Sequence, residues 1–207
     1  MTQNNKHQRR SIRLPHYDYA DEGAYFVTIC TYERVCLFGT VDTTEDAMTL
    51  NTFERFVWDE WEKTGQLRDN VRLDRFVVMP NHVHGIIWIT ENTNQQEQKN
   101  EAKVDTKSPE NVGAQRATPL HLPPLGATHN NVKPSSLGAI VRSFKSAVTK
   151  RINTYRSTLG GIVWQRNYWE RIIRNDEELN WLRWYIDNNP ARWKKDKLYV
   201  SKSDIMK

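Results

Sequence analysis

The hydrophobic and polar positions of this chain follow two different periods. In three segments the apolar residues recur every three or four positions, which is typical of amphipathic helices. The spacing predicts helices over 51–66, 136–153 and 176–189. Asn51 and Ser136 stand where helix caps are expected, and Pro190 marks the end of the last helix because proline cannot continue it.

Other segments are short and rich in β-branched and aromatic residues, which is typical of strands. Residues 24–38 predict one strand, or two joined by a turn, and a short strand is expected at about 162–173. The segments 71–80 and 82–90 flank Pro80–Asn81, so we expect them to form a hairpin.

Three segments differ from this ordered pattern. Residues 1–20 are polar and basic and predict a flexible N-terminal arm. Residues 91–135 contain no Phe, Trp or Tyr, and such a segment cannot bury enough apolar area to offset its ordering entropy, so we expect a long disordered insertion. Residues 196–207 form a basic C-terminal tail, which leaves 21–195 as a single domain interrupted by the insertion.

The elements follow in the order strand, helix, hairpin, insertion, helix, strand, helix. Antiparallel strand pairs mixed with helices predict an α+β sandwich with helices on one face of an antiparallel sheet, as in the split βαβ arrangement. No stretch approaches the roughly 18 apolar residues of a membrane span, and no signal-peptide pattern is present, so we expect a cytoplasmic protein. Cys30 and Cys36 fit half-buried strand positions better than a disulfide or a metal pair.

The strongest candidate chemistry is the triplet His82-Val83-His84 at the start of a predicted strand. Alternate side chains of a strand point to the same face, so both imidazoles face one side while Val83 faces the core. At this spacing they can share one metal ion, and the alternative is a chance pair or two surface histidines. The other four histidines lie in the predicted arm or insertion, which favours the metal site.

Tyr185 and Asn189 form a second candidate pair on the last predicted helix. Four residues apart, they lie on one side of the helix at the edge of its apolar stripe, where the tyrosine can reach the sheet while its hydroxyl stays near solvent. The alternative is an ordinary residue at the rim of an amphipathic helix. Tyr168 competes for the same role, but its strand-like surroundings favour a structural one.

Charge is distributed unevenly along the chain. Thirty Lys and Arg against 25 Asp and Glu give a net charge of +5, but residues 138–174 hold eight basic residues and one acid, Glu170. This basic segment favours binding to the phosphates of a nucleic acid, and the affinity of such binding depends strongly on salt concentration. The alternative is a solvated helix face. Eight tryptophans add flat faces on which unpaired bases can stack, and tryptophan is equally suited to a core.

Together these residues resemble the IS200-like transposases of the HUH single-strand nucleases, and above all the REP-associated tyrosine transposases. The resemblance is carried by the segments RRSIRLPHYDYADEGAYFVTICTYERVCLFG, FVVMPNHVHGIIWI, VWQRNYWERIIR and WLRWYIDNNPARW, in this order along the chain. It covers most of the ordered sequence and fails in the insertion.

The resemblance implies a ferredoxin-like domain that is a metal-dependent endonuclease and strand transferase for single-stranded or hairpin DNA of the REP type. By position, His82 and His84 match the metal ligands, Tyr185 matches the nucleophile that forms a 5′-phosphotyrosine, and Asn189 matches a polar third ligand, although it could equally cap its helix. The implied ion is Mg²⁺ or Mn²⁺. A monomer is expected over a dimer.

The candidate DNA contacts lie in the arm and in the basic segment. They are Arg9, Arg10, Arg13, Arg142, Lys145, Arg166, Arg171 and Arg174. Two other functions stay open: a catalytically inactive protein that binds hairpins in single-stranded DNA, and a metal-dependent nuclease that uses activated water. A purely structural protein is disfavoured by the basic segment beside the histidine pair.

Overall fold

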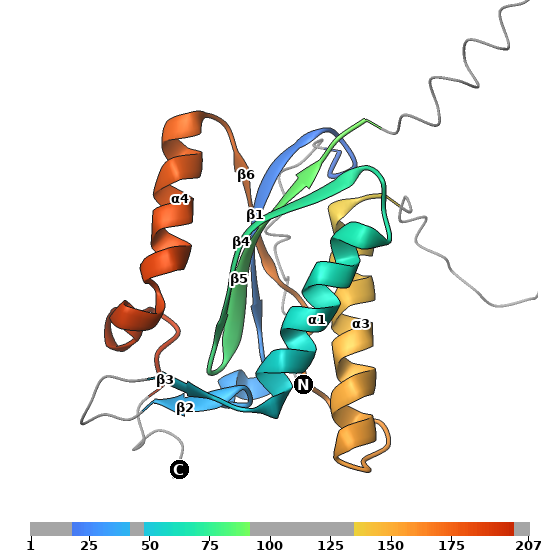
Figure 1. The fold of residues 1–207 in the computed structure, drawn as a ribbon, viewed down its shortest axis with the longest axis vertical. Coiled ribbons are helices and arrows are strands. Elements are labelled where there is room, and N and C mark those ends of the chain that lie inside the picture. The colour runs from blue at the N-terminus through green and yellow to red at the C-terminus, as the bar shows by residue number, and fades with distance from the viewer. Residues whose placement is uncertain (1–17, 42–47, 92–134, 201–207) are drawn as a thin grey trace, which may run out of the picture.

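A four-stranded antiparallel sheet forms the centre of the molecule in the computed structural model, which describes residues 18–41, 48–91 and 135–200 (Figure 1). Its strands stand in the order β4-β5-β1-β6: β1 is Gly23–Cys30, β4 is Val71–Met79, β5 is His82–Ile89 and β6 is Trp169–Ile173. The helices are α1 (Thr52–Gln66), α3 (Leu137–Tyr155) and α4 (Asp176–Asn188). A two-stranded sheet of β2 (Gly39–Val41) and β3 (Met48–Leu50) and 3-10 turns at Tyr32–Arg34 and Pro190–Lys195 complete the described elements.

The main elements follow the order β1-α1-β4-β5-α3-β6, in which two βαβ units interleave their strands. As a result β1 lies between β5 and β6 and pairs antiparallel with both. This is the ferredoxin-like arrangement, and the expected α+β class with an antiparallel sheet is confirmed. The hairpin around Pro80–Asn81 is confirmed as well, with Met79 of β4 opposite His82 of β5.

The placement of the helices differs from the expectation that all of them lie on one face of the sheet. Helices α1 and α3 cover one face, and α4 covers the opposite face (Figure 1). The reason lies in β5, which is buried along almost its whole length. Ile87 packs into the core beneath α1 and α3, whereas Ile86 packs against α4, so both apolar faces of the strand are covered.

Side-chain caps begin the helices where the polar pattern predicts. The Asn51 carboxamide accepts a hydrogen bond from the Phe53 amide at 2.9 Å, and the Ser136 hydroxyl accepts one from the Ala139 amide at 3.4 Å. Helix α4 is capped by Asn175, one residue before its predicted start. After α4, Pro190 ends the α-helix, and the chain continues as the 3-10 turn.

Two predicted strands are shorter in the structure. Strand β1 ends at Cys30, and β6 begins at Trp169. Between them the chain makes an isolated antiparallel bridge, Thr31 with Trp164. The segment that precedes β6 is also tied to α3, because the Lys145 ammonium donates hydrogen bonds to the main-chain carbonyls of Gln165 at 2.6 Å and Arg166 at 3.2 Å. A strand-like composition therefore extends beyond the residues that pair in the sheet.

The larger core lies between the sheet and the α1–α3 layer. The Trp61 ring of α1 stacks on Phe76 of β4, with 4.2 Å between ring centroids and 11° between planes. Gly85 of β5 makes this contact possible, since a Cβ atom there would lie 2.5 Å from the Trp61 ring. The glycine after His84 thus lets α1 pack directly on the strand that carries both histidines.

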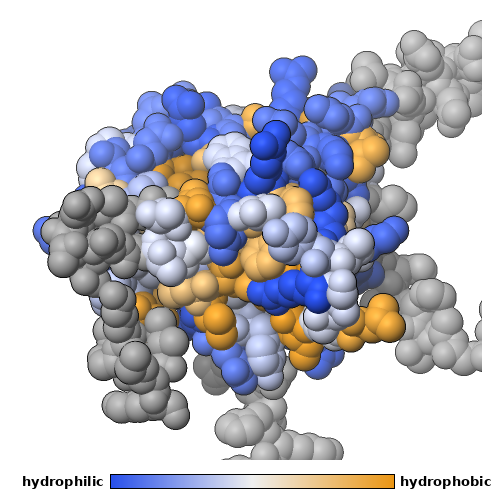
Figure 2. All heavy atoms as spheres, turned by 60° about the horizontal axis from the view of Figure 1, so that its bottom comes forward, coloured by the Kyte–Doolittle hydropathy of each residue, from blue (hydrophilic) through white to orange (hydrophobic). Residues whose placement is uncertain are grey.

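Most of the predicted arm, nearly all of the predicted insertion and residues 201–207 lie outside the described residues. Cys30 and Cys36 are free thiols, and Cys30 lies buried at the end of β1, whereas Cys36 is partly buried in a loop, so the strand position predicted for Cys36 is wrong. Within the described ranges, no helix is both long and apolar enough to cross a membrane. Figure 2 shows the end of the molecule near the β4–β5 turn, where hydrophobic side chains reach the surface in patches between hydrophilic ones.

Candidate functional site

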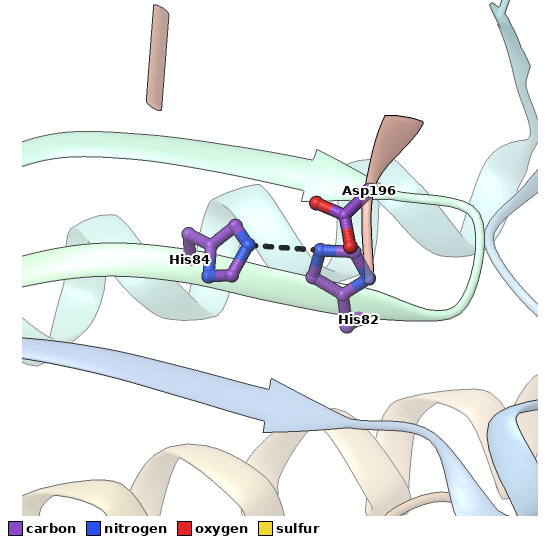
Figure 3. Close-up of side chains that lie close together, drawn as sticks. All are labelled: His82, His84 and Asp196. Atoms are coloured by element: carbon purple, nitrogen blue, oxygen red, sulfur yellow. Dashed lines mark hydrogen bonds between the residues drawn. The ribbon is translucent and has the colours of Figure 1, made fainter. Parts of the chain in front are cut away.

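His82 and His84 point from β5 to the face of the sheet that α4 covers. Both side chains are buried, with exposed fractions of 0% and 3%. Their Nε2 atoms lie 3.0 Å apart, so the two imidazoles converge as the alternation of strand side chains predicts (Figure 3).

The outer nitrogen of each imidazole has a partner that fixes the orientation of the ring. His82 Nδ1 lies 2.8 Å from Asn81 Oδ1, and the amide nitrogen of Asn81 donates to the Leu198 carbonyl at 2.8 Å, so His82 Nδ1 is the donor. His84 Nδ1 lies 2.8 Å from the Thr28 hydroxyl, which can donate or accept. Both Nε2 lone pairs can therefore be turned toward a shared cation when Thr28 accepts.

Burial keeps both imidazoles uncharged at neutral pH. It lowers the pKa of His82 to about 3, with a further contribution from the positive charge of Arg34. The pKa of His84 is also lowered well below its usual value, first by burial and then by the neighbouring His82. Neutral imidazole is the form that binds metal ions.

Tyr185 of α4 extends toward the histidines from the opposite wall of the site. Its hydroxyl lies 3.4 Å from His84 Nε2 and donates to Asp196 Oδ2 at 3.1 Å. The ring packs edge-on against Phe26 of β1 and His84. Burial, followed by the negative charge of Asp196, raises the pKa of Tyr185 to about 12, so the hydroxyl is protonated at neutral pH.

Asp196 completes the site, and the sequence analysis did not identify it. Its carboxylate accepts hydrogen bonds from the Tyr185 hydroxyl, from Asn189 Nδ2 at 3.0 Å and from the Leu198 amide at 2.6 Å. It stands just after the 3-10 turn, at the start of the predicted basic tail. The one signal available was its position as the single acid among residues 188–203.

Asn189 lies in the site, as predicted, but its contacts differ from those of a simple third ligand. The side chain is buried, and its nitrogen donates to Asp196. Its Oδ1 atom is buried and has no hydrogen-bond partner within the described part of the chain. Asn189 therefore holds the Asp196 carboxylate and leaves one oxygen for a further polar or cationic group.

The donor set fits a divalent cation. One ligand atom each from His82, His84 and Asp196 lie within 4.8 Å of one another (Figure 3). Two neutral imidazoles and one carboxylate carry a charge of about −1, and mixed nitrogen and oxygen donors are common around transition-metal ions. The orphaned Asn189 oxygen is a further buried donor on the residue whose nitrogen holds Asp196.

The predicted DNA contacts are divided between different parts of the molecule. Arg142 lies on α3, across the sheet from the histidines, and Lys145 is used to hold main-chain carbonyls. Arg171 on β6 forms an ion pair with Glu178 of α4, and Arg174 is exposed just after β6. Arg166 is exposed in the loop before β6.

Arg9, Arg10 and Arg13 lie outside the described residues. Tyr168, the competing tyrosine, packs against the larger core on the other side of the sheet. Of the two tyrosines weighed from the sequence, the structure thus places Tyr185 beside the histidine pair.

Comparisons with known proteins find a close relative and, among the solved structures that match, two described as transposases. No family model matches the chain. An uncharacterized protein of Haemophilus influenzae (strain ATCC 51907 / DSM 11121 / KW20 / Rd) is 40% identical over 195 residues, which is 94% of each chain. A REP-associated tyrosine transposase bound to a REP hairpin is 18% identical with a TM-score of 0.50, over 87% of this chain and 73% of that chain. A putative transposase of Deinococcus radiodurans R1 is 17% identical with a TM-score of 0.37, over 85% and 95% of the two chains.

Proposed function

Because this chain belongs to one family with the Haemophilus influenzae protein and has the fold of the REP-associated tyrosine transposase, we propose that it is a transposase-like enzyme. Its proposed reaction is metal-dependent cleavage and rejoining of single-stranded DNA, with Tyr185 as the nucleophile. The observation that supports this most strongly is the position of the Tyr185 hydroxyl, which contacts Asp196 at 3.1 Å and His84 at 3.4 Å.

Asp196 is the proposed base for the tyrosine. A hydroxyl whose pKa is about 12 attacks poorly unless its proton is taken, and Tyr185 already donates its proton toward Asp196 Oδ2. As the proton moves to this carboxylate, Tyr185 Oη forms a bond to phosphorus and the bond from phosphorus to the 3′ oxygen breaks. The 3′ oxygen takes up a proton from solvent.

The products are a free 3′-hydroxyl on one fragment and a phosphotyrosine at the 5′ end of the other. This covalent link conserves the phosphoester, so a second 3′-hydroxyl can attack it, release Tyr185 and join a different strand. Rejoining is what separates a strand transferase from a simple nuclease.

His82 and His84 are the proposed metal-binding residues, with Asn189 Oδ1 as a further donor. Asp196, whose carboxylate could also reach a cation there, acts in this proposal as the base. A divalent ion such as Mg²⁺ or Mn²⁺ at this place would withdraw charge from the scissile phosphate as a Lewis acid. Asn81 and Thr28 hold the two imidazoles in the orientation that binding requires.

Hairpin DNA is the proposed substrate, because the REP-associated transposase of the same fold was solved with a REP hairpin. Arg166, Arg171 and Arg174 are the described basic residues that we propose to contact its phosphates. They are exposed in or next to β6, the edge strand beside α4.

The test uses hairpins from the DNA that flanks the gene, labelled at either end and incubated with Mn²⁺. Denaturing gels should show a 3′-labelled fragment attached to the protein, and this band should be lost in Tyr185→Phe and His82→Ala. Tyr155→Phe is the matched control, because this tyrosine is 62% exposed on α3, across the sheet. It should cleave like the unaltered protein.

Other outcomes of this experiment would assign other functions. Binding of several flanking hairpins without cleavage under any metal would indicate an inactive hairpin-binding protein. Cleavage that persists in Tyr185→Phe without a covalent product would indicate a nuclease that uses activated water.

A further inference from the structure

Trp181 of α4 lies next to the proposed nucleophile, Tyr185, on its solvent-exposed side. Its ring stacks on the Tyr185 ring with 5.5 Å between centroids and 13° between planes. The residue is nevertheless 55% exposed. Since the tyrosine covers one face of the indole, the opposite face and the edge account for this exposure.

A cavity of about 760 Å³ lies at this position, bordered by α4, the edge strand β6 and Tyr19, which precedes β1. Trp181 lines it together with Arg171 and Arg174 from the β6 side and Asn175 at the start of α4. Trp181 therefore lines the cavity and also stacks on the ring of the proposed nucleophile, Tyr185.

The charges around the cavity decide which part of a nucleotide it suits. Three acids, Glu170, Glu177 and Glu178, line it as well, and Glu178 forms an ion pair with Arg171. Because the acids offset the guanidinium groups, the inside of the cavity is poorly suited to a phosphate, and the phosphate contacts proposed for Arg171 and Arg174 are with the DNA strand outside it. A flat, neutral heterocycle with hydrogen-bonding edges fits it better, since the indole offers a stacking face and the charged residues offer polar partners.

We propose that Trp181 is the stacking platform for a nucleobase next to the scissile phosphate, and that this base occupies the cavity between α4 and β6. The inference rests on the proposed function, because it assumes single-stranded DNA as the substrate. Stacked on the outer face of Trp181, the base would continue the Tyr185–Trp181 stack and position the strand along the nucleophile. Trp181 would then be a substrate-binding residue.

Binding of a 5′-fluorescein-labelled 12-nucleotide oligothymidine, followed by fluorescence anisotropy in EDTA, tests this without cleavage. Trp181→Ala should weaken binding about tenfold, within the range known for the loss of one base–aromatic stack. Trp181→Phe keeps a ring and should restore most of the affinity. Trp184→Ala is the matched control, because Trp184 is 47% exposed on the same helix and its ring is covered by the Arg192 guanidinium at 5.1 Å.

A second measurement locates the base. In a Tyr185→Phe background, abasic nucleotides are placed one at a time along a hairpin from the flanking DNA. One position near the expected cleavage site should weaken binding, and adding Trp181→Ala should remove the effect of that position alone.

The outcomes separate this inference from the function on which it rests. If the unaltered protein binds oligothymidine and Trp181→Ala binds equally well, the stacking inference is wrong and the proposed function stands. Equal losses in Trp181→Ala and Trp184→Ala would also contradict it, because they indicate a general effect on α4. If the unaltered protein binds no single-stranded DNA, both proposals fail.

Discussion

The two faces of the central sheet differ in what they bury. On the α1–α3 side, β5 contributes Val83, Ile87 and Ile89 to a large apolar core. On the α4 side the same strand contributes His82 and His84, and the buried apolar cluster is small. That cluster consists of Ile86, Leu179, Leu182 and Ile186.

This difference shows how one strand can serve stability and chemistry at once. The residues of the α1–α3 face contact one another through rings and aliphatic chains, whereas the two histidines of the α4 face meet each other and Tyr185 through polar atoms near the start of β5. We therefore expect substitutions on the first face to change the free energy of unfolding and substitutions on the second to change the reaction.

The largest effect should come from Asp196→Asn, which removes the acceptor for the Tyr185 proton while keeping the shape of the side chain. The rate of covalent adduct formation should fall by about 10²–10⁴, the usual contribution of a general base. Single-turnover assays measure this rate. Asp187→Asn is the control, because Asp187 is half exposed and pairs with Arg75 at the surface. An unchanged rate in Asp196→Asn would exclude this carboxylate as the base.

Phe144→Ala should have the largest effect on the other face. Phe144 is 2% exposed and contacts the rings of Trp61, Phe76 and Trp164. Its loss should lower the free energy of unfolding by about 3–5 kcal/mol, measured by denaturant titration, with the adduct rate unchanged while the protein is folded. Tyr155→Ala, on an exposed position of the same helix, should cost far less. Equal losses in the two variants would contradict the proposed division between the faces.

A smaller effect is expected where α4 is anchored to the sheet. Asp74 of β4 accepts hydrogen bonds from Arg183 of α4 at 3.1 Å and from Trp88 at 3.2 Å. Burial alone would raise the pKa of Asp74, but these hydrogen bonds and that of the Arg75 amide outweigh it and lower the pKa. The folded state therefore binds fewer protons than the unfolded state, so this stabilisation is present above about pH 4 and is lost as the pH falls further.

Asp74→Asn should lower the free energy of unfolding at pH 7 by about 1 kcal/mol, and the difference from the unaltered protein should shrink below pH 4. Thermal unfolding across pH measures both. The control is Asp59→Asn, which removes a partner of Arg151 between α1 and α3. Because α4 carries Tyr185, Asp74→Asn should also slow adduct formation whereas Asp59→Asn should not. The opposite pattern would mean that the anchor does not position the nucleophile.

The parts of the site that follow local periodicity could be predicted from the sequence. Alternation along a strand places His82 and His84 on one face, and helical spacing places Tyr185 and Asn189 on one side. Asp196 could not be predicted in this way, because its position depends on a 3-10 turn that folds back toward α4. In the sequence it is a single acid among lysines, which is equally typical of a solvated tail.

The face of the sheet that α4 covers also could not be predicted from the periodicity of apolar residues. The apolar stripe of α4 predicts that the helix packs on a sheet but does not say on which side. A signal was present in the run Ile86-Ile87-Trp88-Ile89, because consecutive apolar residues in a strand indicate burial on both faces. A strand buried on both faces needs a helix on each side of the sheet. The helix on the second side is α4, which carries Tyr185 to the histidines.

The most direct test of the account is to identify the residue that becomes attached to DNA. After reaction with a cleavable hairpin and Mn²⁺, the protein is digested with nuclease and trypsin and its peptides are examined by mass spectrometry. The account predicts a nucleotide on the peptide of residues 184–192, in which Tyr185 is the single tyrosine. A nucleotide on any other tyrosine, or cleavage with no modified peptide, would contradict it.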